Sequence, residues 1–452
     1  MSTMTDVTGT EDPTTPYNIH VSSRYLDLTR KKLELTRLPR EILLPTGRAW
    51  AYGSPKAEFE PLFNQWLDHY DWRARENHLN ATFPQFRTLL PSDHDPPSLR
   101  IHFVHKRSTS KTALPLLYCH SWPGGFAETC KIIDPLTNPG DEGEQAFHLV
   151  VPSLPGCGFS DASESEEMSL EHIAALFDKL MARLGYAKYV AHGSGQWGFS
   201  LIRLLATHHP HSCIATHTTT PLPPLDPPSL TARPLAYLKY RLARLTRARY
   251  PLLRFGYHPS EFLAPPRSAR ARRTHQPFGI LPPAPHTLAF ALCDSPAGLL
   301  AFILAALHSQ TATQGEPPAV PPTETLDLTM LAWLPGPEAA LRMLFPPSLP
   351  VDAGTDISKS RTPNAALKRD WSNVPLGVSV FPALTEESPS TPVAWTGLTQ
   401  RLAWVRRHEG RRAGWPVWER PADVVEDLRA FVSEVVHVEN VRTHESIGDD
   451  VV

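Results

Sequence analysis

Three short apolar runs, each followed by a turn that contains glycine or proline, constrain the fold of this chain more than any other feature. They occupy residues 114–119, 147–151 and 189–191. Such runs are typical of parallel strands that are buried on both faces of a sheet. Between the second and third runs, Ser169 is suited to cap an amphipathic helix and Gly185 to end it. The alternation of strand and helix predicts an α/β domain.

The segments on either side of this pattern divide the chain further. Residues 16–95 carry aromatic side chains at helical spacing, which predicts a helical N-terminal extension, and residues 99–105 alternate like a strand. A strand pattern resumes after Val374, and a helix is expected over 421–435. We therefore expect a disordered tail over 1–15, the extension over 16–95, the core in two halves over 96–220 and 366–440, an insertion over 221–365 and a tail over 441–452.

The insertion is marked by proline. The chain has 48 prolines and 24 glycines, and half of the prolines fall within residues 221–350. Proline fixes φ and lacks a backbone donor, so this segment cannot form a regular sheet. We expect loops and short helices that cover the core as a lid.

Composition and charge exclude several classes of protein. The formal net charge of −2 argues against nucleic-acid binding. The longest apolar run, residues 297–307, is too short for a bilayer span of about 20 residues. The five cysteines lack C-x-x-C spacing, and His208, His209 and His211 lack the spacing of a metal site. We expect a cytoplasmic protein with no cofactor, no bound metal, no nucleic-acid partner and no transmembrane segment.

Three turn motifs carry the chemical information. His120-Ser-Trp-Pro-Gly124 follows the first apolar run, and backbone N–H groups in such a turn can stabilise an oxyanion. Pro155-Gly-Cys-Gly-Phe-Ser-Asp161 is glycine-rich but lacks the lysine of a phosphate-binding loop. His192-Gly-Ser-Gly-Gln-Trp-Gly198 follows the third apolar run and has the form of a nucleophile elbow.

This elbow has no residue suited to its usual task. The central residue of an active elbow attacks the substrate and forms an ester, which requires Ser, Cys or Asp. Gln196 holds the central position here, and its neutral amide cannot form that ester. Ser194 is a poor alternative, because bulky side chains, His192 and Gln196, stand two residues before and after it.

The three motifs resemble those of the microsomal-type epoxide hydrolases, in the forms common in fungi. Two further segments add to the resemblance: Ala74-Arg-Glu-Asn-His-Leu-Asn80 followed by Phe83-Pro-Gln-Phe86, and Asp294-Ser-Pro-Ala-Gly-Leu-Leu300. The resemblance covers roughly residues 16–435. It implies an α/β-hydrolase fold with an N-terminal epoxide-hydrolase-type extension and an inserted, mainly helical, proline-rich lid.

The catalytic residues that the resemblance implies are not matched. The nucleophilic Asp falls on Gln196, although one extra residue precedes the tryptophan here. The charge-relay acid falls on Leu384, and the catalytic His falls on Gly414. Glu386 and His408 are the nearby residues that could substitute for the acid and the base.

The lid departs from the family pattern as well. The two tyrosines that would donate to the epoxide oxygen are missing from residues 278–282 and 341–345. An ester mechanism needs nucleophile, acid and base together, and such groups leave little activity when one is lost. The sequence therefore argues against epoxide hydrolysis by the family mechanism.

A binding cavity is still expected. If the resemblance holds, it is lined by His120, Trp122, Pro123, Trp197 and Trp415, and it accepts a hydrophobic small molecule. Such a pocket suits a cyclisation or isomerisation that needs preorganisation rather than a nucleophile. The leading hypothesis is an epoxide-hydrolase-like cyclase or isomerase of secondary-metabolite biosynthesis. An active epoxide hydrolase and a non-catalytic binding or scaffold protein are the alternatives.

Overall fold

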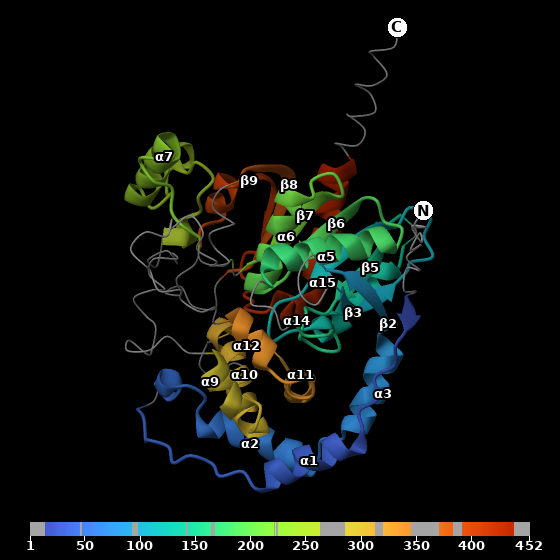
Figure 1. Cartoon of the computed structure of the whole chain (residues 1–452). Coiled ribbons are helices and arrows are strands. Elements are labelled where there is room, and N and C mark those ends of the chain that lie inside the picture. The colour runs from blue at the N-terminus through green and yellow to red at the C-terminus, as the bar shows by residue number, and fades with distance from the viewer. Residues whose placement is uncertain are drawn as a thin grey trace, which may run out of the picture.

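The core of the molecule is a mainly parallel sheet between two layers of helices (Figure 1). This computed structural model describes residues 14–45, 48–92, 98–141, 143–163, 168–220, 222, 225–262, 285–311, 320–344, 370–382 and 391–437. In that part of the chain nine strands pair in the order β1-β2-β3-β5-β4-β6-β7-β8-β9. Their bounds are β1 Thr15–Pro16, β2 Gln85–Pro91, β3 Ser98–Lys106, β4 Leu114–Cys119, β5 Phe147–Pro152, β6 Tyr189–Gly193, β7 Cys213–Thr219, β8 Ser372–Val380 and β9 Gln400–Arg407.

The three apolar runs form β4, β5 and β6, which confirms the predicted parallel strands. β4 lies between β5 and β6 and pairs in parallel with both, and β7, β8 and β9 continue the parallel array. β1, β2 and β3 form an antiparallel edge that joins the array where β3 pairs with β5. The central strands are almost fully buried, as expected for a sheet covered on both faces.

Each face of the sheet has its own apolar cluster. Helices α5 (Leu170–Arg183) and α6 (Gly195–His208) pack on one face, against side chains such as Leu117 and Val150. Helices α4 (Ile133–Thr137) and α15 (Pro421–Phe431) belong to the other cluster, with Leu116 and Leu149. The predicted helix α5 is confirmed together with its ends, since Ser169 forms a capping box and Gly185 has a φ of +86°.

The N-terminal part of the chain holds two strands that the sequence pattern did not reveal: β1, which includes Thr15 of the predicted disordered tail, and β2. Helices α1 (Ser23–Glu34), α2 (Lys56–Asp68) and α3 (Trp72–Thr82) follow the helical expectation. Gln85–Pro91, which was included in the helical region, instead pairs with β3 along its whole length. The prediction was wrong there because buried and half-buried residues do not alternate regularly in this strand.

The described part of the inserted segment between β7 and β8 consists of helices joined by loops and turns. Its helices are α7 (Pro234–Leu245), α9 (Pro285–Leu292), α10 (Pro296–Thr311), α11 (Pro322–Trp333) and α12 (Glu338–Leu344). Figure 1 shows α9 to α12 between the sheet and the arc of the N-terminal helices, and α7 apart from them at the upper left. The predicted absence of regular sheet holds for the described residues of this segment. Within these same limits, no helix is long and apolar enough to cross a membrane.

The extension and the inserted helices are joined by a buried ion pair. Asp327 on α11 accepts a hydrogen bond from Nη2 of Arg75 on α3 at 2.6 Å, and Arg75 Nε donates to both carboxylate oxygens at 3.0 Å. The hydroxyl of Tyr70 also donates to Asp327, at 2.7 Å. The Asp327 side chain is only 5% exposed. The extension therefore helps to fix the position of α11.

Candidate active site

The loops that follow the parallel strands meet at one edge of the sheet. Strands β4 to β9 all run in the same direction, so their carboxyl ends lie together there. Ligands of open α/β sheets bind at this edge. Two cavities open between the loops. We call them the elbow cavity, which adjoins the turn after β6, and the loop cavity, which lies between the loops after β4 and β5.

The strand-to-helix turn after β6 has a glycine at its apex. Gly195 has a φ of +59°, in the left-handed region that an elbow requires of its central residue. Helix α6 begins at this residue. The assignment of Gln196 to the centre of the elbow is corrected accordingly. The apex carries no side chain, and Gln196 is the second residue of α6.

The elbow is one residue longer than the usual small-x-nucleophile-x-small pattern. Gly193 and Gly198 are its two packing glycines, and they are five positions apart rather than four. A Cβ atom on Gly198 would lie 2.3 Å from the carbonyl oxygen of Cys119, and one on Gly193 would lie 2.4 Å from the carbonyl oxygen of Gly198. This close packing explains both glycines and leaves the additional residue in the turn itself.

The elbow cavity combines the elbow with the loop that follows β9. It is lined by Glu128, Ser194, Gly195, Thr219, Thr220, Gly414, Trp415, Pro416, Val417 and Trp418. The residues aligned with the nucleophile region and with the catalytic His therefore lie at one cavity, and neither Gly195 nor Gly414 has a side chain. Glu419 fixes the Gly414 loop, because its Oε2 accepts hydrogen bonds from the N–H groups of Gly414 and Trp415 at 2.7 and 2.6 Å.

Among the described residues that line the elbow cavity, Glu128 is the only one with a carboxyl group. It follows the His120–Gly124 turn on the short helix η2 (Phe126–Lys131) and is 1% exposed. Its carboxyl group folds back over Gly124, where an added Cβ would lie 1.9 Å from Oε2. Neither carboxyl oxygen has a well-formed hydrogen bond. Burial raises the pKa of Glu128 to about 8, although the nearby hydroxyls of Tyr118 and Ser194 lower it in part.

Glu128 is therefore a neutral acid at pH 7 for most of the time. Tyr118 lies beside it at the end of β4, and its hydroxyl is also buried without a well-formed hydrogen bond. Burial and the neighbouring Glu128 raise the pKa of Tyr118 well above its usual value, so this hydroxyl keeps its proton as well. Neither residue could be recognised from the sequence, because nothing in the local pattern distinguishes a buried Glu from an exposed one.

Two buried, uncharged histidines lie on the strands next to the elbow, His192 on β6 and His217 on β7. His192 Nδ1 and His217 Nδ1 on neighbouring strands are 3.0 Å apart, and His217 Nε2 lies 3.1 Å from Ser379 Oγ. Burial lowers the pKa of His192 to about 3 and that of His217 well below its usual value. These rings therefore connect three strands by hydrogen bonds without carrying charge.

Of the two residues that could substitute for the acid and the base, the structure describes His408 but not Glu386. Glu386 lies outside the described residues, as does Leu384 at the expected acid position. His408 follows β9, pairs with Asp427 at 2.7 Å and stacks on Phe381 with ring centroids 4.5 Å apart. It is not among the residues that line either cavity. The described contacts of His408 thus connect β9 to α15 and the end of β8.

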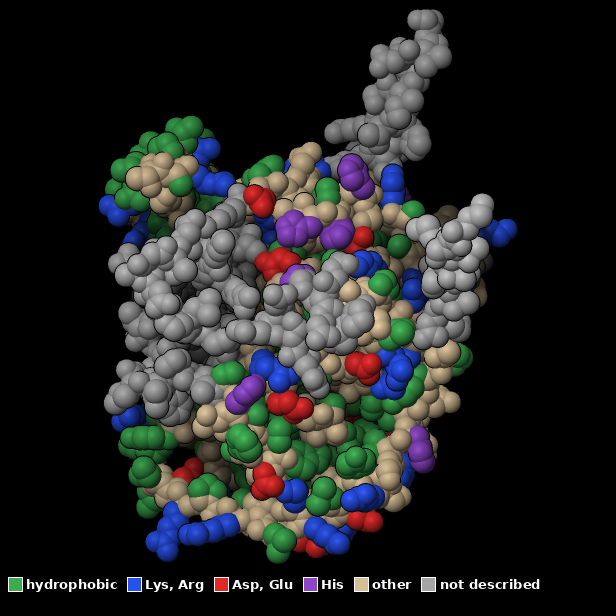
Figure 2. Space-filling model, in the orientation of Figure 1, with side chains coloured by type: hydrophobic (Ala, Val, Ile, Leu, Met, Phe, Trp, Pro, Cys, Tyr) green, Lys and Arg blue, Asp and Glu red, His purple; other side chains and the backbone are tan. Residues whose placement is uncertain are grey.

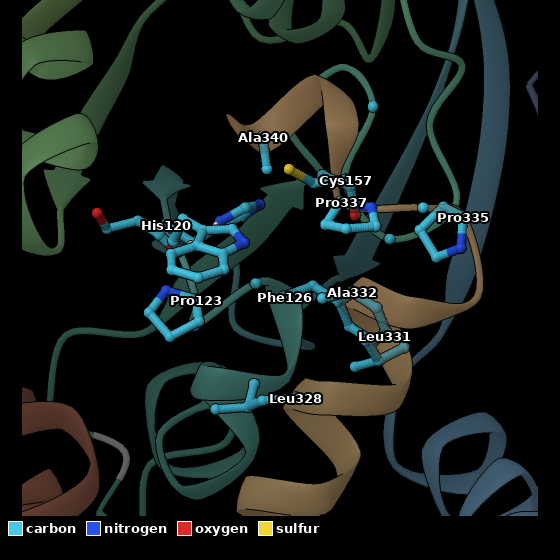
Figure 3. Close-up of a pocket in the computed structure, with 18 residues that line it drawn as sticks. His120, Pro123, Phe126, Cys157, Leu328, Leu331, Ala332, Pro335, Pro337 and Ala340 are labelled. Carbon is cyan, nitrogen blue, oxygen red and sulfur yellow. Dashed lines mark hydrogen bonds between the residues drawn. The ribbon is translucent and has the colours of Figure 1, made fainter. Parts of the chain in front are cut away.

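The loop cavity contains three of the predicted substrate-binding residues. Figure 3 shows His120 and Pro123 on one side, with Leu331 of α11 and Pro337 of the α11–α12 connection facing them. Trp122 also lines this cavity. His120 Nε2 accepts a hydrogen bond from the N–H of Leu154 at 3.2 Å, and burial lowers the pKa of His120 to about 4. The lining is apolar apart from a few such groups.

The two remaining predicted binding residues have different positions. Trp415 lines the elbow cavity, and its Nε1–H donates to the carbonyl oxygen of Leu307 at 3.2 Å. Trp197 is a correction: it is 4% exposed and packs in the core with the side chains of α5 and α6. Because α6 begins at Gly195, Trp197 faces the core and lies outside the described lining of both cavities. No cluster of three or more metal-ligating side chains occurs among the residues that the structure describes.

The parallel sheet, the elbow after β6 and the helical insertion after β7 together define an α/β-hydrolase fold. Family models agree with this class. Residues 115–273 match the model described as "alpha/beta hydrolase fold", and residues 14–129 match "Epoxide hydrolase N terminus". The extension and the elbow thus come from one family architecture.

The chain belongs to the epoxide hydrolase family. It is 32% identical over 419 residues to a Stigmatella aurantiaca protein whose name places it among epoxide hydrolases, covering 92% of this chain and 84% of that protein. It is 27% identical to epoxide hydrolase 1 of Sus scrofa, with 92% and 88% covered. The Aspergillus niger epoxide hydrolase structure matches with a TM-score of 0.64 at 25% identity, covering 94% of this chain and 97% of that one. The juvenile hormone epoxide hydrolase of Bombyx mori has the same fold, with a TM-score of 0.73 at 24% identity and 95% and 96% covered.

Proposed function

We propose that this epoxide-hydrolase-like protein is a cyclase or isomerase that acts on an oxygenated, hydrophobic small molecule in a secondary-metabolite pathway. The observation that carries the proposal is the pair of glycines that line the elbow cavity, Gly195 at the apex of the elbow and Gly414 in the loop after β9. Neither can form an ester or act as a base. A buried neutral carboxyl group, Glu128, stands beside them instead.

The family supports an epoxide as the reacting group, and an epoxide is opened by protonation of its oxygen. Glu128 donates its proton to that oxygen as one C–O bond breaks. A hydroxyl group of the same substrate attacks the carbon, forms the new C–O bond and returns its proton to the Glu128 carboxylate. Substrate and product are isomers, and the enzyme ends in its starting state. The hydroxyls of Tyr118 and Ser194 next to Glu128 hydrogen-bond its anion between the two proton transfers.

The lining of the elbow cavity supports a hydrophobic substrate. Its walls include Trp415, Val417 and Trp418, which suit an apolar carbon skeleton near the reacting oxygen. Ring closure in such a site depends on how the flexible chain is folded rather than on a protein nucleophile.

Isotope labelling tests this reaction. The purified protein is incubated in H₂¹⁸O with hydrophobic epoxides that carry a free hydroxyl, and the products are analysed by mass spectrometry. We expect cyclic ethers with the mass of the substrate and no ¹⁸O, because the attacking oxygen comes from the substrate itself.

Two outcomes would contradict the proposal. A diol that contains one ¹⁸O atom would identify an active epoxide hydrolase, whether through Glu386 and His408 or through a directly activated water. Saturable binding of these epoxides with no product above the buffer control would identify a binding or scaffold protein.

The pH dependence of the same reaction follows from the state of Glu128. Its pKa is raised to about 8, so the acid form predominates below that pH and the carboxylate above it. We expect kcat to be level between about pH 6 and 7 and to fall about tenfold per pH unit well above pH 8. A kcat that rises through pH 8 would mean that the carboxylate acts as a base, which the proposal excludes.

A further inference from the structure

Helix α7 and the turn after it form the most basic stretch of the described chain. Between Asp226 and Glu261 there is no acidic residue. The same stretch contains seven cations: Arg233, Lys239, Arg241, Arg244, Arg247, Arg249 and Arg254. All except the half-buried Arg233 are exposed, and the structure gives none of the seven an ion pair within the described residues. This local charge contrasts with the net charge of −2 for the chain as a whole.

The same helix presents leucines to solvent. Leu235, Leu238, Leu242 and Leu245 recur at helical spacing and share one side of α7. Leu235 is 74% exposed, Leu238 54% and Leu245 83%. Just beyond the helix, Leu252 is 90% exposed. An amphipathic helix of a folded domain normally packs its apolar side against the core. In α7 the apolar side faces solvent instead.

The opposite side of α7 is what holds it to the protein. Tyr240 and Ala243 are buried and pack in a small separate cluster with Ala248, Tyr257 and Trp395. Trp395 belongs to the η6 turn (Val393–Leu398), which immediately precedes β9 and so ties the cluster to the sheet. The helix is therefore anchored with its leucines outward. Figure 2 shows apolar and basic side chains together on the lobe at the upper left, where Figure 1 places α7.

We propose that the outward face of α7 is a docking surface for a membrane that contains anionic lipid. Leucines that project from an anchored helix insert into the boundary between headgroups and acyl chains. Lysine and arginine at the edges of the stripe reach the phosphate and carboxylate groups of the headgroups. Leu235, Leu238 and Leu245 supply the apolar contact, and the cations on either side supply the attraction to negative charge.

The leucines favour a lipid surface over a nucleic acid. A nucleic acid would pair with the cations but would leave three largely exposed leucines in water. A lipid surface satisfies both sets of side chains at once. The docking proposal does not depend on the reaction that the elbow cavity performs.

Vesicle co-sedimentation tests the proposal with the full chain. The probes are vesicles of phosphatidylcholine alone and of phosphatidylcholine mixed with phosphatidylserine. We expect binding to the mixed vesicles that weakens as salt is added. The double variant Leu238→Ser/Leu245→Ser should reduce the partition coefficient between water and the mixed vesicles at least about tenfold. The reason is that two leucine side chains are no longer transferred from water into the lipid surface. Arg241→Gln/Arg244→Gln should reduce binding to the mixed vesicles and make it less sensitive to salt.

The matched control is Leu35→Ser/Leu43→Ser in the N-terminal extension, where the two leucines are 84% and 99% exposed. This control should bind vesicles like the unaltered protein. The proposal is overturned if the protein binds neither kind of vesicle, or if the α7 leucine variant binds as well as the control. Salt-sensitive binding to duplex DNA that the leucine variant leaves unchanged, without vesicle binding, would instead identify a polyanion site.

Discussion

Replacing Glu128 with glutamine is expected to lower kcat for ring formation by about 10²–10⁴-fold, the usual contribution of a positioned acid. Glutamine has nearly the same shape as the protonated glutamic acid that the elbow cavity holds at pH 7. Its amide can donate a hydrogen bond but cannot transfer a proton to the epoxide oxygen. Binding should survive, so KM should change little while kcat falls. The measurement is a steady-state comparison of the two proteins on the epoxide that gives the cyclic ether.

Two further variants separate catalysis from folding. Glu128→Asp keeps an acid with a shorter side chain and should recover part of the lost kcat. Glu60→Gln changes a half-exposed glutamate on α2 and should have no effect on kcat. The proposed role of Glu128 is disproved if the Glu128→Gln protein keeps both the kcat and the thermal unfolding midpoint of the unaltered protein. The Glu128→Gln protein should also lose the fall in activity above pH 8, which a purely structural role would not affect.

The parallel core could be predicted from the sequence because burial on both faces leaves a continuous apolar signature. The runs that became β4, β5 and β6 need no knowledge of their neighbours to be recognised. Helix α5 was equally clear, since its apolar face, its serine cap and its terminal Gly185 all agree. The strand Gln85–Pro91 was missed because its surroundings are formed by β1 and β3, which pair with it. The residues of the strand alone do not indicate that pairing.

The candidate site shows a different limit. In Gly193-Ser-Gly-Gln-Trp-Gly198 either Gly195 or Gln196 fits the centre of an elbow by spacing, and only the φ of Gly195 distinguishes them. Glu128 could not be identified at all, because glutamates are rarely fully buried and the local sequence gives no sign that this one is. Its position results from the turn at Gly124, which leaves room for the carboxyl group to fold back. The chemistry of the site thus depends on backbone conformation that residue spacing does not specify.

The contact between the extension and the inserted helices leads to the second large effect. Asp327→Ala is expected to lower the free energy of unfolding by about 3–5 kcal/mol, the usual cost of removing one partner of a buried ion pair. The variant removes the acceptor that the Arg75 guanidinium and the Tyr70 hydroxyl share. Because the Asp327 side chain is only 5% exposed in the unaltered protein, water has little access to replace it. Urea titration followed by tryptophan fluorescence measures the shift of the unfolding midpoint.

A second ion pair across the same contact provides the control. Lys32 on α1 pairs with Asp294, whose side chain is 80% exposed, so Asp294→Ala should cost less than about 1 kcal/mol. Arg75→Leu combined with Asp327→Ala should cost less than the sum of the two single changes, because the double variant buries no unpaired charge. Equal losses for Asp327→Ala and Asp294→Ala would contradict the assignment. The extension would then be held to α11 by its apolar contacts alone, and the buried Arg75–Asp327 pair would serve only to fix the geometry of the two helices.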